Sequence, residues 1–311
     1  MYKSETIKFD KAFFIKMGRK GAWEESAIKQ GKIRIGWREI KLGDIQQERW
    51  DKIKKEIRTL SKTDGSASAD FNALRNIYDA DSNTVFITFY GGKLYWCKSK
   101  TTVKRVLEDD ISKYRPVDGQ WQCRDMKGEI LDLSKVPGKI SKVQRFSGTC
   151  CQVHEFDILF RLINGLHSEE YKAIEKARKQ LTNEVKRGIT LLHPKEFELL
   201  VELIFRQSGW RRVSVLGESL KDIDLELEDP ITLDRYMVQI KSESNVKEFK
   251  EYAVRYNEQY KDKFRYFYYV VHTTKEKLRS DDERIKIVLP DELAKMVISS
   301  GLVDWLLNKI R

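Results

Sequence analysis

Alternation of apolar and polar residues predicts two neighbouring strands in the C-terminal third of the chain. The alternation runs through residues 222–227 and again through residues 236–241, as in strands with one buried face. The polar segment 228–234 between them is typical of a hairpin loop. The pattern therefore predicts an antiparallel pair at this point of the chain.

Acidic and basic side chains gather on these two predicted strands. Because successive strand residues point to opposite faces, Asp222, Asp224 and Glu226 share one face of the first strand. Gln239 and Lys241 share one face of the second. Pairing of the strands would bring carboxylates and an ammonium group together at a sheet end. Such a group can hold a hard divalent cation and position a water molecule beside it.

A helix is predicted upstream, over residues 193–205, with Pro194 in its first turn. Glu198 and Glu202 are four residues apart and therefore share one face of this helix. The helix should stop near Gly209, and residues 211–216 should form the next strand.

The remaining apolar segments predict an alternation of helices and strands at both ends of the chain. In the C-terminal part we expect a helix at 248–259, strands at 266–272 and 285–290, and a last helix from Asp291. In the N-terminal part we expect strands at 12–16, 33–37, 83–90 and 93–97, a short helix at 24–30, helices within 41–80, and further strands near 121–124 and 145–150 that close a small barrel. Residues 154–192 read as a mostly helical connector.

The order of a helix with glutamate, a strand, a strand with aspartate and a strand with Gln-x-Lys resembles the PD-(D/E)XK nuclease superfamily, and within it the Mrr-like restriction endonucleases. This resemblance implies a restriction-endonuclease-like mixed sheet flanked by helices over residues 193–311. It also implies the catalytic residues Glu198, Asp224, Gln239 and Lys241. Mg²⁺, with Mn²⁺ as an alternative, would be held by Asp224, Glu198 and the main-chain carbonyl of Ile240. Asp222 stands where the family usually has a small residue, so Asp224 is the preferred metal-binding aspartate.

The N-terminal part resembles the PUA-like superfamily, specifically its EVE and YTH members. The resemblance rests on residues 13–16, Trp23, residues 27–29 and the run Ile35-Gly36-Trp37. It implies a β-barrel with helices whose aromatic side chains stack on a modified base extruded from its strand. Trp37 is the first candidate for an aromatic side chain that stacks on the base, followed by Trp23 and Trp96. Flanking phosphate contacts are expected from Arg19, Lys20 and Arg38, and the alternative is that these charges are simply solvated.

The composition of the chain indicates a polyanionic binding partner. The 311 residues carry a net charge of +11, which favours nucleic acid over a membrane surface. The four cysteines show no Cys-x-x-Cys spacing, so reduced thiols are expected rather than a zinc site. No signal-peptide core and no membrane-spanning run is present, so a cytoplasmic location is expected.

We therefore predict an α+β, α/β protein with a PUA-like modified-base reader at 1–153, a helical connector at 154–192 and an Mrr-like nuclease at 193–311. Its predicted activity is modification-dependent cleavage of double-stranded DNA, in the manner of a type IV restriction endonuclease. Cutting both strands implies a homodimer. Two alternatives remain, an RNA-directed reader-nuclease and a non-catalytic nucleic-acid-binding protein.

Overall fold

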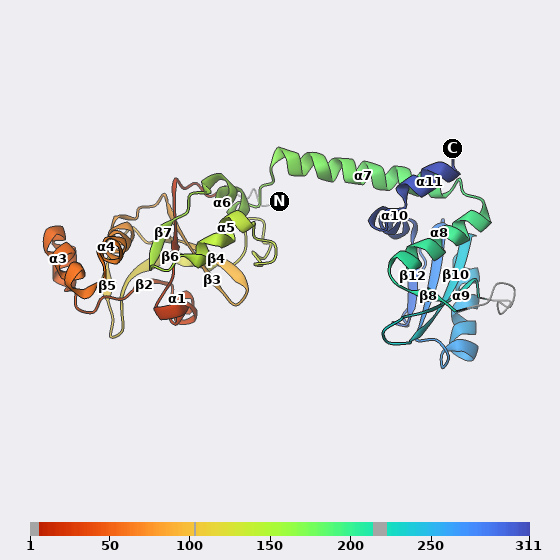
Figure 1. Cartoon of the computed structure of the whole chain (residues 1–311), viewed down its shortest axis with the longest axis horizontal. Coiled ribbons are helices and arrows are strands. Elements are labelled where there is room, and N and C mark those ends of the chain that lie inside the picture. The colour runs from red at the N-terminus through yellow and green to blue at the C-terminus, as the bar shows by residue number, and fades with distance from the viewer. Residues whose placement is uncertain (1–5, 103, 214–222) are drawn as a thin grey trace. The chain divides into compact units, whose positions relative to one another are not determined.

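The computed structural model describes residues 6–102, 104–213 and 223–311, so Asp222 and the second half of the strand predicted at 211–216 lie outside the described residues. The chain divides into two compact units, Met1–Glu169 and Glu170–Arg311 (Figure 1). Each unit has its own sheet and its own buried core.

A seven-stranded sheet organises the first unit. Its order is β2-β6-β4-β3-β1-β7, with β5 paired to β6. All pairs are antiparallel except β1 with β3. The strands are β1 (Lys11–Ile15), β2 (Lys32–Ile35), β3 (Thr84–Tyr90), β4 (Lys93–Ser99), β5 (Leu107–Glu108), β6 (Lys113–Gln122) and β7 (Cys150–Gln152).

The curvature of this sheet comes from β6. Its first half pairs with β2 and its second half with β4, and the register with β4 shifts between Trp96 and Lys98. A bulge of this kind bends and twists a strand, so the sheet curls into a half-barrel. The prediction of a strand over residues 145–150 is wrong. A 3₁₀ turn, η2 (Lys142–Arg145), occupies its beginning, and β7 starts only at Cys150.

Helices cover the two faces of the half-barrel with separate apolar clusters. They are α1 (Glu24–Lys29), α2 (Leu42–Gln46), α3 (Trp50–Leu60), α4 (Asp64–Asp79), α5 (Gly138–Ser141) and α6 (Phe156–Ile163), with a 3₁₀ turn η1 (Arg19–Gly21). Helix α4 begins with a capping box between Thr63 and Ser66. Ile53 and Ile57 of α3 and Leu74 of α4 are buried in one cluster, whereas Leu159 of α6 is buried in the other.

Helix α6 belongs to the first unit through both packing and hydrogen bonding. Leu159 and Ile163 pack in the cluster that contains Phe14. Asn164, at the end of the helix, is buried and bonds to both main-chain groups of Ile7. Its Oδ1 accepts from the Ile7 N–H at 2.7 Å and its Nδ2 donates to the Ile7 carbonyl at 3.1 Å. The segment expected as one connector is thus divided, with α6 in the first unit.

The second unit contains a five-stranded mixed sheet in the order β12-β11-β10-β9-β8. Strands β10, β11 and β12 run parallel, and β9 is antiparallel to β10, which confirms the hairpin expected from the alternating pattern. The strands are β8 (Arg211–Arg212), β9 (Leu225–Glu228), β10 (Arg235–Glu243), β11 (Tyr266–Thr273) and β12 (Ile285–Val288).

Helices pack on both faces of this sheet. They are α8 (Pro194–Gln207), α9 (Val246–Arg255), which continues into a π-turn at Tyr256–Tyr260, α10 (Pro290–Ser299) and α11 (Val303–Lys309), together with the C-terminal end of α7 (Glu169–Ile189), where Val185 and Ile189 are buried. Phe197 and Val201 of α8 pack with Ile240 of β10 on one face, whereas Phe249 of α9 packs with Tyr269 on the other. Strand β10 therefore lies between two helical layers, with α8 on one side and α9 on the other.

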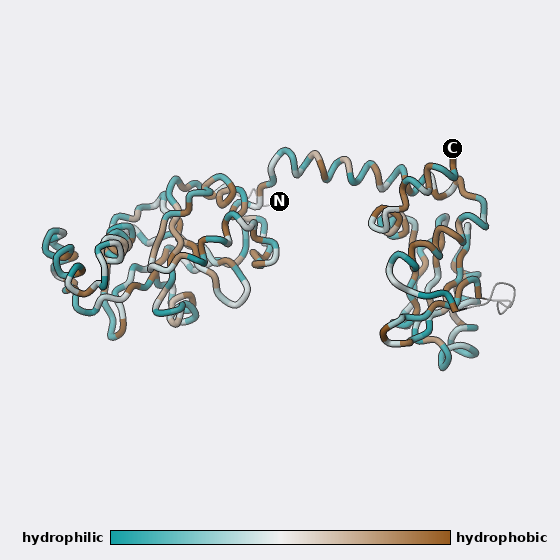
Figure 2. The backbone as a smooth tube through the Cα atoms, viewed as in Figure 1, coloured by the Kyte–Doolittle hydropathy of each residue, from teal (hydrophilic) through white to brown (hydrophobic). Residues whose placement is uncertain are grey.

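Hydrophobic residues gather along the strands of each unit, and most of α7 is hydrophilic (Figure 2). Within the described parts of the chain, no helix combines the length and the apolar character that crossing a bilayer requires.

We expect Asn164→Ala to destabilise the first unit by about 1–3 kcal/mol, because the partly buried N–H and carbonyl of Ile7 would lose their partner. Two-transition thermal unfolding of the full chain measures the effect. Asn72→Ala, at an exposed position of α4, is the matched control and should leave both transitions in place. An equal shift of the second unit's transition by Asn164→Ala would contradict this assignment of α6.

Candidate functional sites

The carboxylate of Asp224 is anchored to strand β10. Asp224 directly precedes β9, and its Oδ2 accepts the main-chain N–H of Ile240 at 2.6 Å and the side-chain amide of Gln239 at 2.5 Å. The carboxylate is half-buried. Burial raises the pKa of Asp224 above its ordinary value, and the negative charge of Glu198 adds to the rise, while the Ile240 bond and the charges of Lys241 and Lys195 oppose it.

Glu198 and Glu202, which share a face of α8, have different partners. Glu198 is half-buried and close enough to Asp224 to influence its charge. Glu202 pairs instead with Arg212 at 2.7 Å and with Arg206 at 3.9 Å. The helix is placed by a capping box at its start, where Glu196 and His193 bond reciprocally. Glu198 is therefore the glutamate of α8 that belongs with Asp224.

Lys241 is held in its charged form by helix α9. Its Nζ lies 3.5 Å from a carboxylate oxygen of Glu248 and 4.9 Å from the centre of the Tyr252 ring. Burial lowers the pKa of Lys241, but a hydrogen bond with Tyr252 and the charges of Glu248 and Asp224 outweigh it, so the pKa lies above its ordinary value. Lys241 is thus a cation at neutral pH and can donate hydrogen bonds.

The donor set around Asp224 fits a hard divalent cation. Gln239 is buried, and its Oε1 has no hydrogen-bond partner. The N–H and C=O of one strand residue point to the same side, so the Ile240 carbonyl faces Asp224 as its N–H does. Two carboxylates, an amide oxygen and a main-chain carbonyl are ligands that Mg²⁺ accepts. Among the described residues, no cluster of three or more histidine, cysteine, aspartate or glutamate side chains is arranged to hold a metal.

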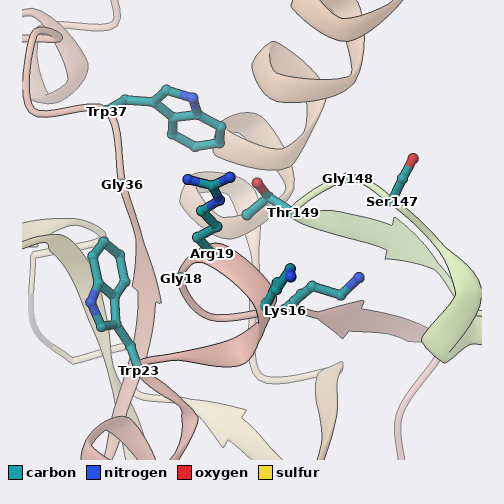
Figure 3. Close-up of a pocket in the computed structure, with 10 residues that line it drawn as sticks. Lys16, Gly18, Arg19, Trp23, Gly36, Trp37, Ser147, Gly148 and Thr149 are labelled. Carbon is teal, nitrogen blue, oxygen red and sulfur yellow. The ribbon is translucent and has the colours of Figure 1, made fainter.

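A second candidate site is a pocket of about 390 Å³ in the first unit. Two tryptophans, Trp23 and Trp37, contribute its aromatic surface. In Figure 3, Arg19 rises between Trp37 and Thr149, and Lys16 lies beside it. The described residues that line the pocket are Lys16, Gly18, Arg19, Lys20, Trp23, Gly36, Trp37, Ser147, Gly148 and Thr149.

Trp37 is fixed by contacts on its main chain and on its ring. It follows β2 and Gly36 and adopts a left-handed backbone conformation, with φ of 58°. The buried Lys113 donates to its carbonyl at 2.7 Å. Its indole also bonds to Asp70 of α4, whose pKa is nevertheless raised because the carboxyl is buried. This backbone conformation is uncommon for a bulky residue, so the surrounding bonds must hold it in place.

Trp23 is positioned by the loop that carries Arg19. The main-chain N–H of Trp23 donates to the Met17 carbonyl at 3.0 Å. Gly18 has φ of 79°, and a Cβ atom at this position would approach the Trp23 ring to 2.8 Å. Glycine is therefore required here both for the backbone conformation and for contact with the indole. On the opposite side, Lys16 donates to the Phe146 carbonyl at 2.6 Å, which holds the segment before β7 against β1.

Two predicted residues of the base-binding site, Trp96 and Arg38, lie outside the pocket. Trp96 is buried in the core between α5, α6 and the sheet, and its indole N–H donates to the Arg124 carbonyl at 2.8 Å. It does not line the pocket. Arg38 is exposed next to Trp37 but is also outside the lining, whereas Lys20 is part of it.

Several residues that shape the two sites carry no distinctive sequence signal. Tyr252 and Glu248 hold Lys241 from a separate helix, and Lys113 and Asp70 hold Trp37 from β6 and α4. Each lies on a different element from the residue that it supports. The spacing of residues within one element does not reveal such a contact.

We expect Asp224→Asn to raise the unfolding midpoint of the second unit in metal-free buffer at neutral pH. The folded state holds the Asp224 proton to a higher pH than the unfolded chain does, so wild-type stability falls as pH rises through the raised pKa. The asparagine has no such loss, so the difference should grow as pH rises from the ordinary carboxyl range through the raised pKa of Asp224, and then level off. Asp304→Asn, at an exposed position of α11, should show no such trend. A lower midpoint for Asp224→Asn at neutral pH would mean that the carboxylate's bonds to β10 outweigh the charge.

Residues 189–293 match the family model Mrr_cat, described as restriction endonuclease. No curated protein and no solved structure matches the chain. The matched segment contains α8, β9, β10 and β11, and so includes Glu198, Asp224, Gln239 and Lys241. The C-terminal part of the chain is therefore a restriction-endonuclease-like domain.

Proposed function

We propose that this protein is a modification-dependent DNA endonuclease, with a nuclease site around Asp224 and a base-reading site at the Trp23–Trp37 pocket. The observation that carries the nuclease part is the fixed position of the Asp224 carboxylate on β10, beside Gln239 and Lys241 of the same strand. The restriction-endonuclease match over the same residues supports it.

The roles of the residues follow from their charge and position. Asp224, Glu198, Gln239 Oε1 and the Ile240 carbonyl would hold Mg²⁺, or Mn²⁺ in its place. The bound ion would supply positive charge that stabilises the phosphate as the phosphodiester bond is hydrolysed. Lys241, charged because of Tyr252 and Glu248, would donate hydrogen bonds to the attacking water or to a phosphate oxygen and so orient them.

The reading part of the proposal rests on the pocket of the first unit. A base that leaves the duplex loses stacking, and stacking on a tryptophan returns about 1–3 kcal/mol. Arg19 and Lys20 are exposed at the same pocket and can contact phosphates that flank the extruded nucleotide. The whole chain would thereby restrict DNA that carries a modified base, and it would act as a homodimer when it cuts both strands.

Asp224→Ala and Lys241→Ala should each reduce cleavage by about 10²-fold or more, because each removes charge at the reacting phosphate. DNA binding should stay within a few-fold, since dispersed phosphate contacts carry most of the affinity. Glu198→Gln should also impair cleavage strongly. Glu202→Gln is its matched control, because that side chain pairs with Arg212.

Cleavage is measured on modified DNA, plain DNA and RNA of the same sequence, with Mg²⁺ or Mn²⁺ added. Wild-type activity of Asp224→Ala would remove the nuclease assignment. Equal impairment by Glu198→Gln and Glu202→Gln would show that α8 does not present Glu198 to the site. Preferential cutting of RNA would replace the DNA proposal with an RNA-directed one.

Trp37→Ala should weaken binding of modified DNA by about tenfold to a hundredfold and leave binding of plain DNA nearly unchanged. Trp37→Phe, which retains an aromatic face, should keep part of the preference. Thermal unfolding of both variants is the control, because Trp37 also contacts the core of the first unit. A folded Trp37→Ala protein with full preference for modified DNA would show that this indole does not bind the base.

A further inference from the structure

The polar surface of the Trp23–Trp37 pocket consists of hydrogen-bond donors. Lys16, Arg19 and Lys20 bring three cations to it, and Ser147 and Thr149 bring two hydroxyls. The remaining described residues of its lining are the two tryptophans and three glycines. No described carboxylate and no described aliphatic side chain lines the pocket. This polar lining differs from the apolar aromatic pocket that would suit a methyl group.

The carboxylates nearest to the pocket are engaged elsewhere. Glu24 follows Trp23, and its Oε1 accepts from the buried hydroxyl of Thr88 at 3.4 Å. Asp70 stands behind Trp37 and accepts from its indole and from Ser61. Burial raises the pKa of both carboxyl groups, so their negative charge is disfavoured where they lie. Of the three cations of the pocket, Lys16 interacts electrostatically with Glu24, whereas Arg19 and Lys20 have no carboxylate partner among the described residues.

Arg19 is the cation placed to contact a ligand directly. Among the described residues, it has no ion pair and no side-chain hydrogen bond, and the same holds for Lys20. By contrast, Lys16 already donates one bond to the Phe146 carbonyl. The guanidinium lies between Trp37 and Thr149 (Figure 3). A planar fork of donors in this position matches a group with two oxygens, such as a carboxylate.

We propose that this pocket reads a base whose substituent carries oxygen, a carboxyl group or a hydroxymethyl group, in preference to a methyl group. The inference rests on the proposed base-reading function of the same pocket and specifies its substrate class. The indoles stack on the ring of the base, which any base allows, while Arg19 and the Thr149 hydroxyl select the substituent. A methyl group offers these donors no acceptor, so their hydration would be lost without replacement.

The test compares four duplexes that differ at one pyrimidine ring carbon, which carries hydrogen, methyl, hydroxymethyl or carboxyl. Binding to the full-length protein is measured by competition in buffer with chelated divalent metal, so that no strand is cut. We expect the carboxyl duplex to bind at least tenfold more tightly than the methyl duplex, with hydroxymethyl between them. The advantage of carboxyl should shrink as salt is raised, because the contact is ionic.

Arg19→Gln tests the residue that carries the argument. It should reduce the carboxyl-over-methyl preference to a few-fold. Arg38→Gln is the matched control, since that side chain is exposed beside Trp37 but outside the lining. It should lower affinity for all four duplexes alike and keep their order. Melting curves establish that both variants are folded.

The outcomes separate this inference from the proposed function. A duplex with methyl bound as tightly as carboxyl, and both well above hydrogen, would overturn the inference and leave the reader in place. Equal binding of all four duplexes would overturn the reader and the inference together. An undiminished carboxyl-over-methyl preference in Arg19→Gln would also overturn the inference, because the selecting donor would then be another group.

Discussion

The two hydrogen bonds that join the Asp224 carboxylate to β10 are the constraint on which the nuclease-like site depends. They hold the start of β9 against the strand that carries Gln239 and Lys241, so the side chains of Asp224, Gln239 and Lys241 share one rigid support. The cost is a carboxylate in a place where burial and Glu198 disfavour its charge. Sites that bind cations commonly accept such a cost, because the bound charge compensates for it.

The two sites share one method of construction. In each, the active residue lies just outside a strand, Asp224 before β9 and Trp37 after β2, where the sheet no longer dictates its conformation. Distant residues then replace the sheet in fixing it. The main chain of Ile240 does this for Asp224, and Lys113 does it for Trp37. Local freedom at the strand end and long-range anchoring together give a precise position.

The sequence alone predicts those helices and strands whose apolar and polar residues alternate with a strong local period. The alternating pattern predicted the hairpin of β9 and β10 and placed Gln239 and Lys241 on one face, and the start of α8 followed from Pro194. It was insufficient where distant contacts decide. Trp37 and Trp96 both occur in or directly after apolar strands, and only the folded chain shows one at a pocket and the other in the core. The strand predicted at 145–150 likewise begins only at Cys150, because the preceding loop is held by Lys16, whose side chain donates to the Phe146 carbonyl and whose main-chain N–H donates to the Thr149 carbonyl.

The left-handed backbone of Trp37 has a consequence for the timing of recognition. A residue held in an unfavoured conformation by Lys113 and Asp70 is already in place before any ligand arrives. Trp37 therefore has little side-chain entropy to surrender when a ligand binds. In the proposed reading of an extruded base, the slow event would lie in the nucleic acid, where the base must leave its stack. Association rates would therefore follow the opening rate of the base pair more closely than any motion of the protein.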